Sequence, residues 1–122
     1  MFETSFEQIR RLNSQSVMAY RQGEYERGVH FAEQACHLGK SAFGTNHRDY
    51  ATLLNNLALL YQEMGRLGEA EPLHRQAMEI FKQQLGETHP SYASSLSNLA
   101  VLYQAMGRLG EAEPLHRQAM EI

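Results

Sequence analysis

A sequence repeat with a period of 42 residues constrains the fold of this 122-residue chain more than any other feature. The stretch MGRLGEAEPLHRQAMEI occupies residues 64–80 and recurs without a change at residues 106–122. When residues 47–80 are aligned with residues 89–122, 27 of the 34 positions are identical. A period of this length is typical of architectures in which each repeat forms one supersecondary unit that stacks on the next.

A further shift by 42 residues uncovers a third, more divergent copy near the N-terminus. Gly23 and Gly44 in this copy align with Gly65 and Gly86, and Leu12 aligns with Leu54. We therefore expect a single domain over residues 1–122, made of three repeats at about 5–46, 47–88 and 89–122, the last of them truncated.

Each repeat reads as two helices. Apolar side chains over residues 50–64 recur at steps of three and four, which marks an amphipathic helix, and a second such stripe covers residues 67–85. No segment shows the period of two that marks a strand. The fold class predicted is all-α, a solenoid of three helix-turn-helix hairpins, with helices at 3–22 and 24–41, 48–64 and 68–85, and 90–106 and 109–122.

Two prolines refine these boundaries. Pro72 fits its helix only if the helix begins near Gly68, because a proline is tolerated close to the first turn and disrupts a helix interior. Pro90 suits the first position of its helix, and Thr88 or His89 is expected to cap that helix.

Small residues occupy three equivalent positions of every repeat, so that the two helix axes can approach closely. All nine are Ala, Ser or Gly: Ser16, Gly28, Ala35, Ala58, Ala70, Ala77, Ala100, Ala112 and Ala119. With Leu57 and Tyr61 beside them, this pattern resembles the tetratricopeptide repeat (TPR). The 42-residue period, with NNLALLYQ and LGETHPSYA, resembles the kinesin light chain type of that repeat. The first repeat departs from the pattern at Gln15 and Ala19, where Leu and Tyr are usual.

The resemblance implies binding without chemistry. Its members form a right-handed superhelix whose concave face, built from the first helix of each hairpin, holds a peptide from a protein partner. The side chains at these positions are mostly uncharged, and their amides can both donate to and accept from a peptide backbone. The expected groove residues are Asn13, Tyr20, Arg21, Asn55, Asn56, Leu59, Gln62, Ser97, Asn98, Val101 and Gln104.

The role of the asparagines has two interpretations. Asn56 and Asn98 stand where similar repeats use an asparagine to hold the main chain of the ligand; alternatively, they tie neighbouring helices together. Chaperone-binding members also carry Lys or Arg that clamp a C-terminal carboxylate. We do not expect such a clamp, because the matching positions hold Asn13, Val17, Asn55, Leu59, Ser97 and Val101.

Composition argues against most other functions. The net charge is −3 without a basic run, so neither nucleic acid nor an anionic membrane is an expected partner. No apolar segment is long enough to span a bilayer, and the single Cys36 fits a reducing compartment, so a cytoplasmic location is expected. The six histidines form no ligand-like cluster. The chain is therefore expected to be neither an enzyme nor a protein that binds a metal or cofactor.

The second seventeen-residue copy ends at Ile122, whereas the first continues through FKQQLG. This difference suggests a fragment of a longer array, with an uncovered end at Leu115, Ala119, Met120 and Ile122. Such an end could form a homodimer across a two-fold axis. Two alternatives to peptide binding therefore stay open: a structural self-association module, and a consensus-like array without an evolved ligand.

Overall fold

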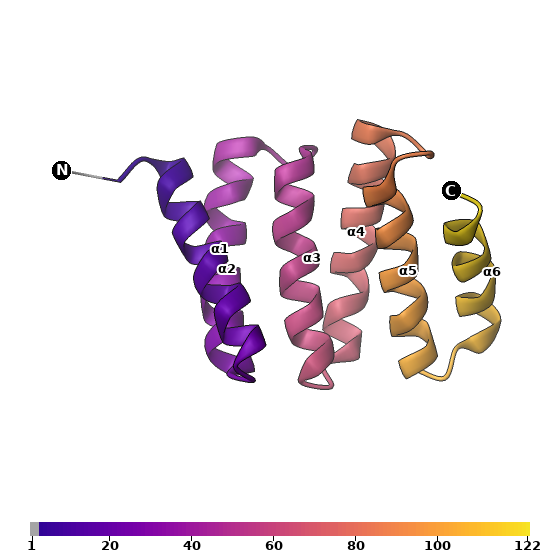
Figure 1. Ribbon diagram of the computed structural model, residues 1–122. Coiled ribbons are helices and arrows are strands. Elements are labelled where there is room, and N and C mark those ends of the chain that lie inside the picture. The colour runs from indigo at the N-terminus through magenta and orange to yellow at the C-terminus, as the bar shows by residue number, and fades with distance from the viewer. Residues whose placement is uncertain (1–2) are drawn as a thin grey trace.

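The computed structural model describes residues 3–122 as three helix hairpins arranged in a row (Figure 1). The helices are α1 (Ser5–Arg21), α2 (Tyr25–Phe43), α3 (Arg48–Glu63), α4 (Leu67–Leu85), α5 (Pro90–Ala105) and α6 (Leu109–Met120). Within the described residues there is no strand, which confirms the all-α prediction. The predicted boundaries differ from these by at most two residues, and Met1 and Phe2 of the expected domain lie outside the described residues.

Histidines cap two of the helices that open a repeat. The Nδ1 atom of His47 accepts from the backbone N–H of Asp49, and that of His89 accepts from Ser91, both at 3.0 Å. Of the two caps predicted for α5, His89 is therefore the right one, with Pro90 at the first helical position. These contacts give the two histidines a structural role.

A left-handed glycine ends each of these helices. Gly65 has φ 76°, its N–H donates to the carbonyl of Gln62, and the N–H of Arg66 donates to the carbonyl of Tyr61. This pair of bonds is a Schellman motif, which satisfies the last carbonyls of α3 and turns the chain into α4. Gly107 repeats the motif after α5.

The small residues lie where the helices of a hairpin cross. Eight of the nine are buried, and Ala58, Ala70, Ala77 and Ala100 have no exposed surface. A Cβ atom built on Gly28 would lie 2.7 Å from Cδ2 of Leu60 in the next repeat, so this site also needs a close approach. The ninth, Ala119, is half exposed, because the part of the chain that the structure describes has no helix beyond α6.

The helix that contains Pro72 begins within one residue of Gly68, the predicted start. Because α4 begins at Leu67, Pro72 is its sixth residue and lies in the second turn. The hydrogen bond that a proline cannot donate would have reached the carbonyl of Gly68, an exposed residue in the first turn of α4. The helix therefore continues through the proline to Leu85.

Candidate peptide-binding groove

The first helices of the three hairpins are tied to one another by asparagine side chains. Asn56 on α3 donates from Nδ2 to Oδ1 of Asn13 on α1 at 2.7 Å. One repeat later, Asn98 on α5 makes the same bond to Asn55 on α3, at 3.1 Å. The structure thus shows the helix-tying role that was the alternative interpretation of Asn56 and Asn98. All four side chains remain partly exposed, so each keeps further hydrogen-bonding capacity.

Two hollows lie along this row of helices. The α1–α3 hollow, of about 470 Å³, is lined by Phe6, Ile9, Arg10, Asn13, Phe43, Asp49, Thr52 and Leu53. The α3–α5 hollow, of about 240 Å³, is lined by Thr52, Asn55, Phe81, Pro90, Ser91, Ser94, Ser95 and Asn98. We use the name groove for these two hollows together with the exposed residues of α1, α3 and α5 between them.

None of the eleven predicted groove residues is fully buried. Asn13, Asn55 and Asn98 line the two hollows, while Tyr20, Asn56 and Leu59 line a shallow dip between α1 and α3. Gln62, Ser97, Val101 and Gln104 lie on the same helices outside the hollows, and Val101 is 46% exposed. Arg21 is exposed at the end of α1.

A buried histidine supports the middle of the groove from behind. His74 on α4 is 1% exposed, and its Nδ1 and Nε2 atoms lie 3.2 Å from Oδ1 of Asn55 and 3.3 Å from Oε1 of Gln62. Burial lowers the pKa of His74 to about 4, so the ring is neutral at pH 7. A neutral ring carries one N–H, so it donates to only one of these two amide oxygens.

Sequence reasoning missed the aromatic wall of the α1–α3 hollow. The rings of Phe6 and Phe43 lie 5.5 Å apart, and His47 stacks on Phe43 at 5.1 Å. Phe6 is 55% exposed. Phe43 belongs to α2, whereas the groove was predicted from the first helix of each hairpin only. The one available signal was the alignment of Phe43 with Leu85, two apolar residues that each precede a loop glycine.

Comparisons with known proteins agree with this architecture. The tetratricopeptide repeat family profile matches residues 8–83 and 49–122, which together cover most of the sequence. The chain belongs to the tetratricopeptide repeat family. Among curated protein sequences no significant match was found.

Solved structures place this TPR protein with the kinesin light chain type. The crystal structure of BtubC (BKLC) from P. vanneervenii is similar over 99% of this chain and 48% of its own, at 24% identity and a TM-score of 0.92. A putative kinesin light chain from Podosopora anserina with nearly identical TPR-like repeats is similar over 98% and 56%, at 28% identity and a TM-score of 0.85. The chain thus spans about half the length of these two proteins.

A third structure contains a bound peptide. The second TPR of Spaghetti, bound to the HSP90 peptide SRMEEVD, is similar over 93% of this chain and 91% of its own. The identity is 21% and the TM-score is 0.70, so this likeness concerns the fold.

Among residues 3–122, no helix is long and apolar enough to cross a membrane. Nor does this part of the chain hold a group of His, Cys, Asp or Glu side chains that could bind a metal ion. The thiol of Cys36 is half buried among apolar side chains, and burial raises its pKa to about 12, so it stays protonated at neutral pH.

Proposed function

We propose that this TPR protein is an interaction scaffold that binds an extended peptide segment of a partner protein in the groove. The observation that carries the proposal is the row of asparagines, which combines fixed positions with spare hydrogen-bonding capacity at about one site per repeat. Each bond between neighbouring helices holds an amide in a defined orientation, and the side chains remain partly exposed. An amide held in this way can pair with a peptide group irrespective of the peptide side chains.

The hollows would supply specificity. The α1–α3 hollow joins the two phenylalanines to Arg10, whereas the α3–α5 hollow is lined mainly by hydroxyl and amide groups. A bound segment would therefore place an apolar side chain near Phe6 and small polar side chains near Ser94. The TPR of Spaghetti, with its HSP90 peptide, is a precedent for peptide binding on this fold.

The first prediction concerns Asn98. Peptides selected from a displayed random library on the wild-type chain should bind Asn98→Ala and Asn56→Ala about tenfold more weakly, since each variant loses one hydrogen bond in a partly dry site. Fluorescence anisotropy measures the affinity, and circular dichroism checks that the fold survives. Gln76→Ala, at an exposed position of α4, is the matched control and should bind normally. Equal affinity for all four chains would refute the asparagine row as the binding element.

The second prediction concerns salt. Between 50 and 500 mM NaCl the affinity of these peptides should fall by no more than about threefold, because hydrogen bonds and apolar contacts are little screened. Of the predicted groove residues only Arg21 is charged, and Arg10 and Asp49 in the α1–α3 hollow have opposite signs. A steep loss with salt would instead indicate an acidic peptide held by Arg10 and Arg21.

Self-association is the second candidate function, and the exposure of the α6 end favours it. Met120 is 86% exposed and Ile122 is 41% exposed, whereas Leu115 and Ala119 are half buried against α5. If this end pairs with that of a second molecule, sedimentation should show a concentration-dependent dimer that the double substitution Met120→Glu with Ile122→Lys dissociates. A strict monomer at high concentration would rule this candidate out.

A further inference from the structure

A buried ring joins three amide side chains behind the middle of the groove. The Nδ1 atom of His74 lies 3.2 Å from Oδ1 of Asn55, and its Nε2 atom lies 3.3 Å from Oε1 of Gln62. The same Asn55 oxygen accepts from Nδ2 of Asn98 at 3.1 Å. The ring is 1% exposed, whereas all three amides are partly exposed. We call these four side chains the His74 relay, since they link the buried ring to the groove.

The single proton of the neutral ring fixes the order of this relay. The Asn55 oxygen is turned inward by the bond from Asn98, and an oxygen in that place calls for a donor at Nδ1 of the ring. Nε2 then has a lone pair and no hydrogen, so it needs a donor from Gln62. Turning the Gln62 amide about its last bond exchanges the oxygen for the NH2 group and supplies that donor.

The relay therefore leaves opposite groups of two amides available to a ligand. Asn55 uses its oxygen toward the ring, and no bond within residues 3–122 uses its two N–H groups. Gln62 uses its NH2 group toward the ring, so its oxygen is left. The two residues are seven positions apart, or about two turns of α3, and Asn55 lines the α3–α5 hollow.

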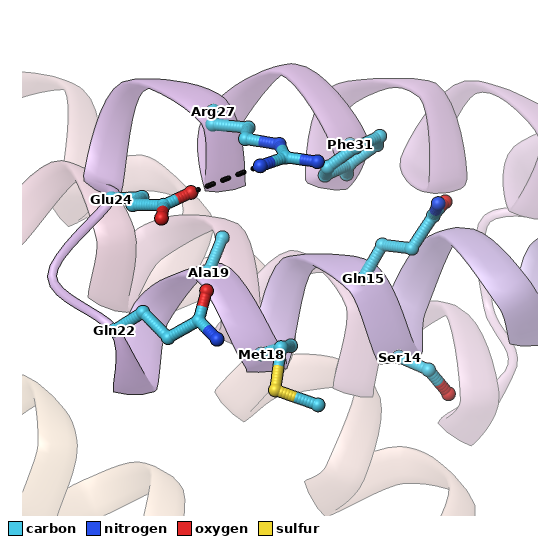
Figure 2. Close-up of a pocket in the computed structure, with 8 residues that line it drawn as sticks. All are labelled: Ser14, Gln15, Met18, Ala19, Gln22, Glu24, Arg27 and Phe31. Atoms are coloured by element: carbon cyan, nitrogen blue, oxygen red, sulfur yellow. Dashed lines mark hydrogen bonds and ion pairs between the residues drawn. The ribbon is translucent and has the colours of Figure 1, made fainter.

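The first repeat has no such relay. Ala32 stands in the place of His74, and Tyr20 stands in the place of Gln62. The amide of Gln22 lies elsewhere, in a hollow of about 230 Å³ that is lined by none of the predicted groove residues (Figure 2). No histidine lines that hollow. Gln22 is therefore a matched control for Gln62, an amide on the first helix of a hairpin without a ring behind it.

The third repeat holds half of the relay. The Nε2 atom of His116 lies 3.1 Å from Oε1 of Gln104, as in the middle repeat. Ser97 replaces Asn55, however, and the ring makes no bond to it within the described residues. His116 is also partly exposed. Among residues 3–122 the complete relay is thus a feature of the middle repeat, and the hairpin itself does not require it.

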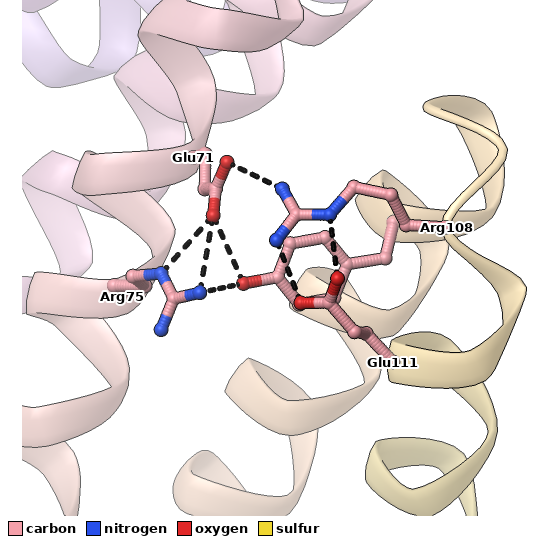
Figure 3. Close-up of polar contacts among 5 residues, drawn as sticks. Glu71, Arg75, Arg108 and Glu111 are labelled. Carbon is pink, nitrogen blue, oxygen red and sulfur yellow. Dashed lines mark hydrogen bonds and ion pairs between the residues drawn. The ribbon is translucent and has the colours of Figure 1, made fainter.

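Polar contacts hold the helix that carries the ring. Glu71 on α4 accepts from the hydroxyl of Tyr103 at 3.0 Å and from Nη1 of Arg108 at 2.9 Å (Figure 3). Arg75, the residue after His74, also donates to the Tyr103 hydroxyl. These contacts fix α4, and the ring with it, relative to α5. Groups that are held in place before binding lose less conformational freedom when a ligand arrives.

We propose that His74 is a positioning residue of the groove, whose ring keeps the N–H groups of Asn55 and the oxygen of Gln62 available to a bound segment. This inference rests on the proposed function, because it requires that the groove binds a peptide. It also defines the ligand further. The segment brings a carbonyl oxygen to Asn55 and an N–H, from its backbone or from a polar side chain, to Gln62. The buried ring itself touches no ligand.

The first test measures the tautomer of His74. In a chain with isotopically labelled histidine, a proton–nitrogen correlation spectrum at pH 7 distinguishes a protonated ring nitrogen from one with a lone pair. We expect the proton of His74 on Nδ1, whereas His116 should give signals averaged over both tautomers. A proton on Nε2 of His74 would overturn the proposal. The measurement uses no ligand and no variant, so its outcome is independent of whether the groove proposal holds.

The second test measures binding of peptides selected from a displayed library on the wild-type chain. Gln62→Ala and His74→Leu should each bind about tenfold more weakly. Because His74 acts through the groove amides, the double variant should bind no more than about twofold more weakly than His74→Leu alone. Gln22→Ala should bind like the wild type. Circular dichroism checks that each variant folds.

A conservative replacement separates positioning from packing. Glutamine offers one donor and one acceptor group, as the neutral ring does, so His74→Gln should keep more affinity than His74→Leu. Equal affinity of the wild type and His74→Leu would overturn the proposal. Losses that add fully in the double variant would overturn it as well, because they would mean that the ring and Gln62 act independently. If His74→Leu does not fold, the tautomer of the wild-type chain still decides.

Discussion

Acidification from pH 7 to pH 5 should lower the free energy of unfolding by about 2 kcal/mol, through His74. Its pKa is about 4 in the folded chain, compared with 6.5 for an exposed imidazole. Between pH 6.5 and pH 4, His74 therefore binds a proton in the unfolded chain but not in the folded chain. The contribution to stability is full above pH 6.5 and is lost as the pH falls toward 4. Urea unfolding at a series of pH values measures it.

The repeat provides its own control for this effect. His116 stands in an identical stretch of sequence but is partly exposed, and its Nε2 atom lies 3.1 Å from Oε1 of Gln104. His74→Gln should flatten the profile between pH 7 and pH 5, and His116→Gln should leave most of the slope in place. The opposite outcome would mean that burial of His74 is not the source of the acid sensitivity.

Replacing Ala70 by leucine should destabilise the chain by ~1–3 kcal/mol, because the α3–α4 crossing has no room for a larger side chain. Ala70 has no exposed surface and packs in the same cluster as Leu57, Ala58 and Tyr61. A leucine there must push α3 and α4 apart or adopt a strained rotamer. Thermal unfolding followed by circular dichroism measures the change.

Gln76→Leu is the control for this substitution. Gln76 lies on the same helix and is exposed, so the added apolar atoms meet water instead of a helix. Its midpoint of unfolding should stay close to that of the wild type. If Ala70→Leu left the midpoint unchanged as well, a close helix crossing could not be what the small residues provide.

Most of the architecture could be predicted from the sequence, because the interactions that produce it are local. A stripe of apolar side chains three and four residues apart predicts a helix with one buried side. Gly65 predicts the end of α3, because glycine readily adopts the left-handed conformation of the turn. The 42-residue period then requires equivalent hairpins to stack in one direction. Pro72 correctly indicated a helix start near Gly68, because a proline is tolerated only near the beginning of a helix.

The helices that carry the candidate site could be predicted from the sequence, but the hydrogen bonds among its side chains could not. Sequence placed Asn56 and Asn98 on one side of the solenoid, but it left open whether they would hold a ligand or tie neighbouring helices together. The bonds join residues 43 positions apart, so they depend on the distance between neighbouring hairpins. Phe43 entered the site because the end of α2 lies beside α1, which no pattern within α2 indicates.

The two identical stretches show what sequence by itself determined and what only the tertiary structure decided. Both copies form the same turn and helix, since turns and helices depend on residues within a few positions of one another. Yet His74 is buried and His116 is not, and Glu71 binds Tyr103 while Glu113 is exposed. Burial, the pKa of His74 and the surface available to a partner depend on which helix lies alongside, and that is a property of the assembled solenoid.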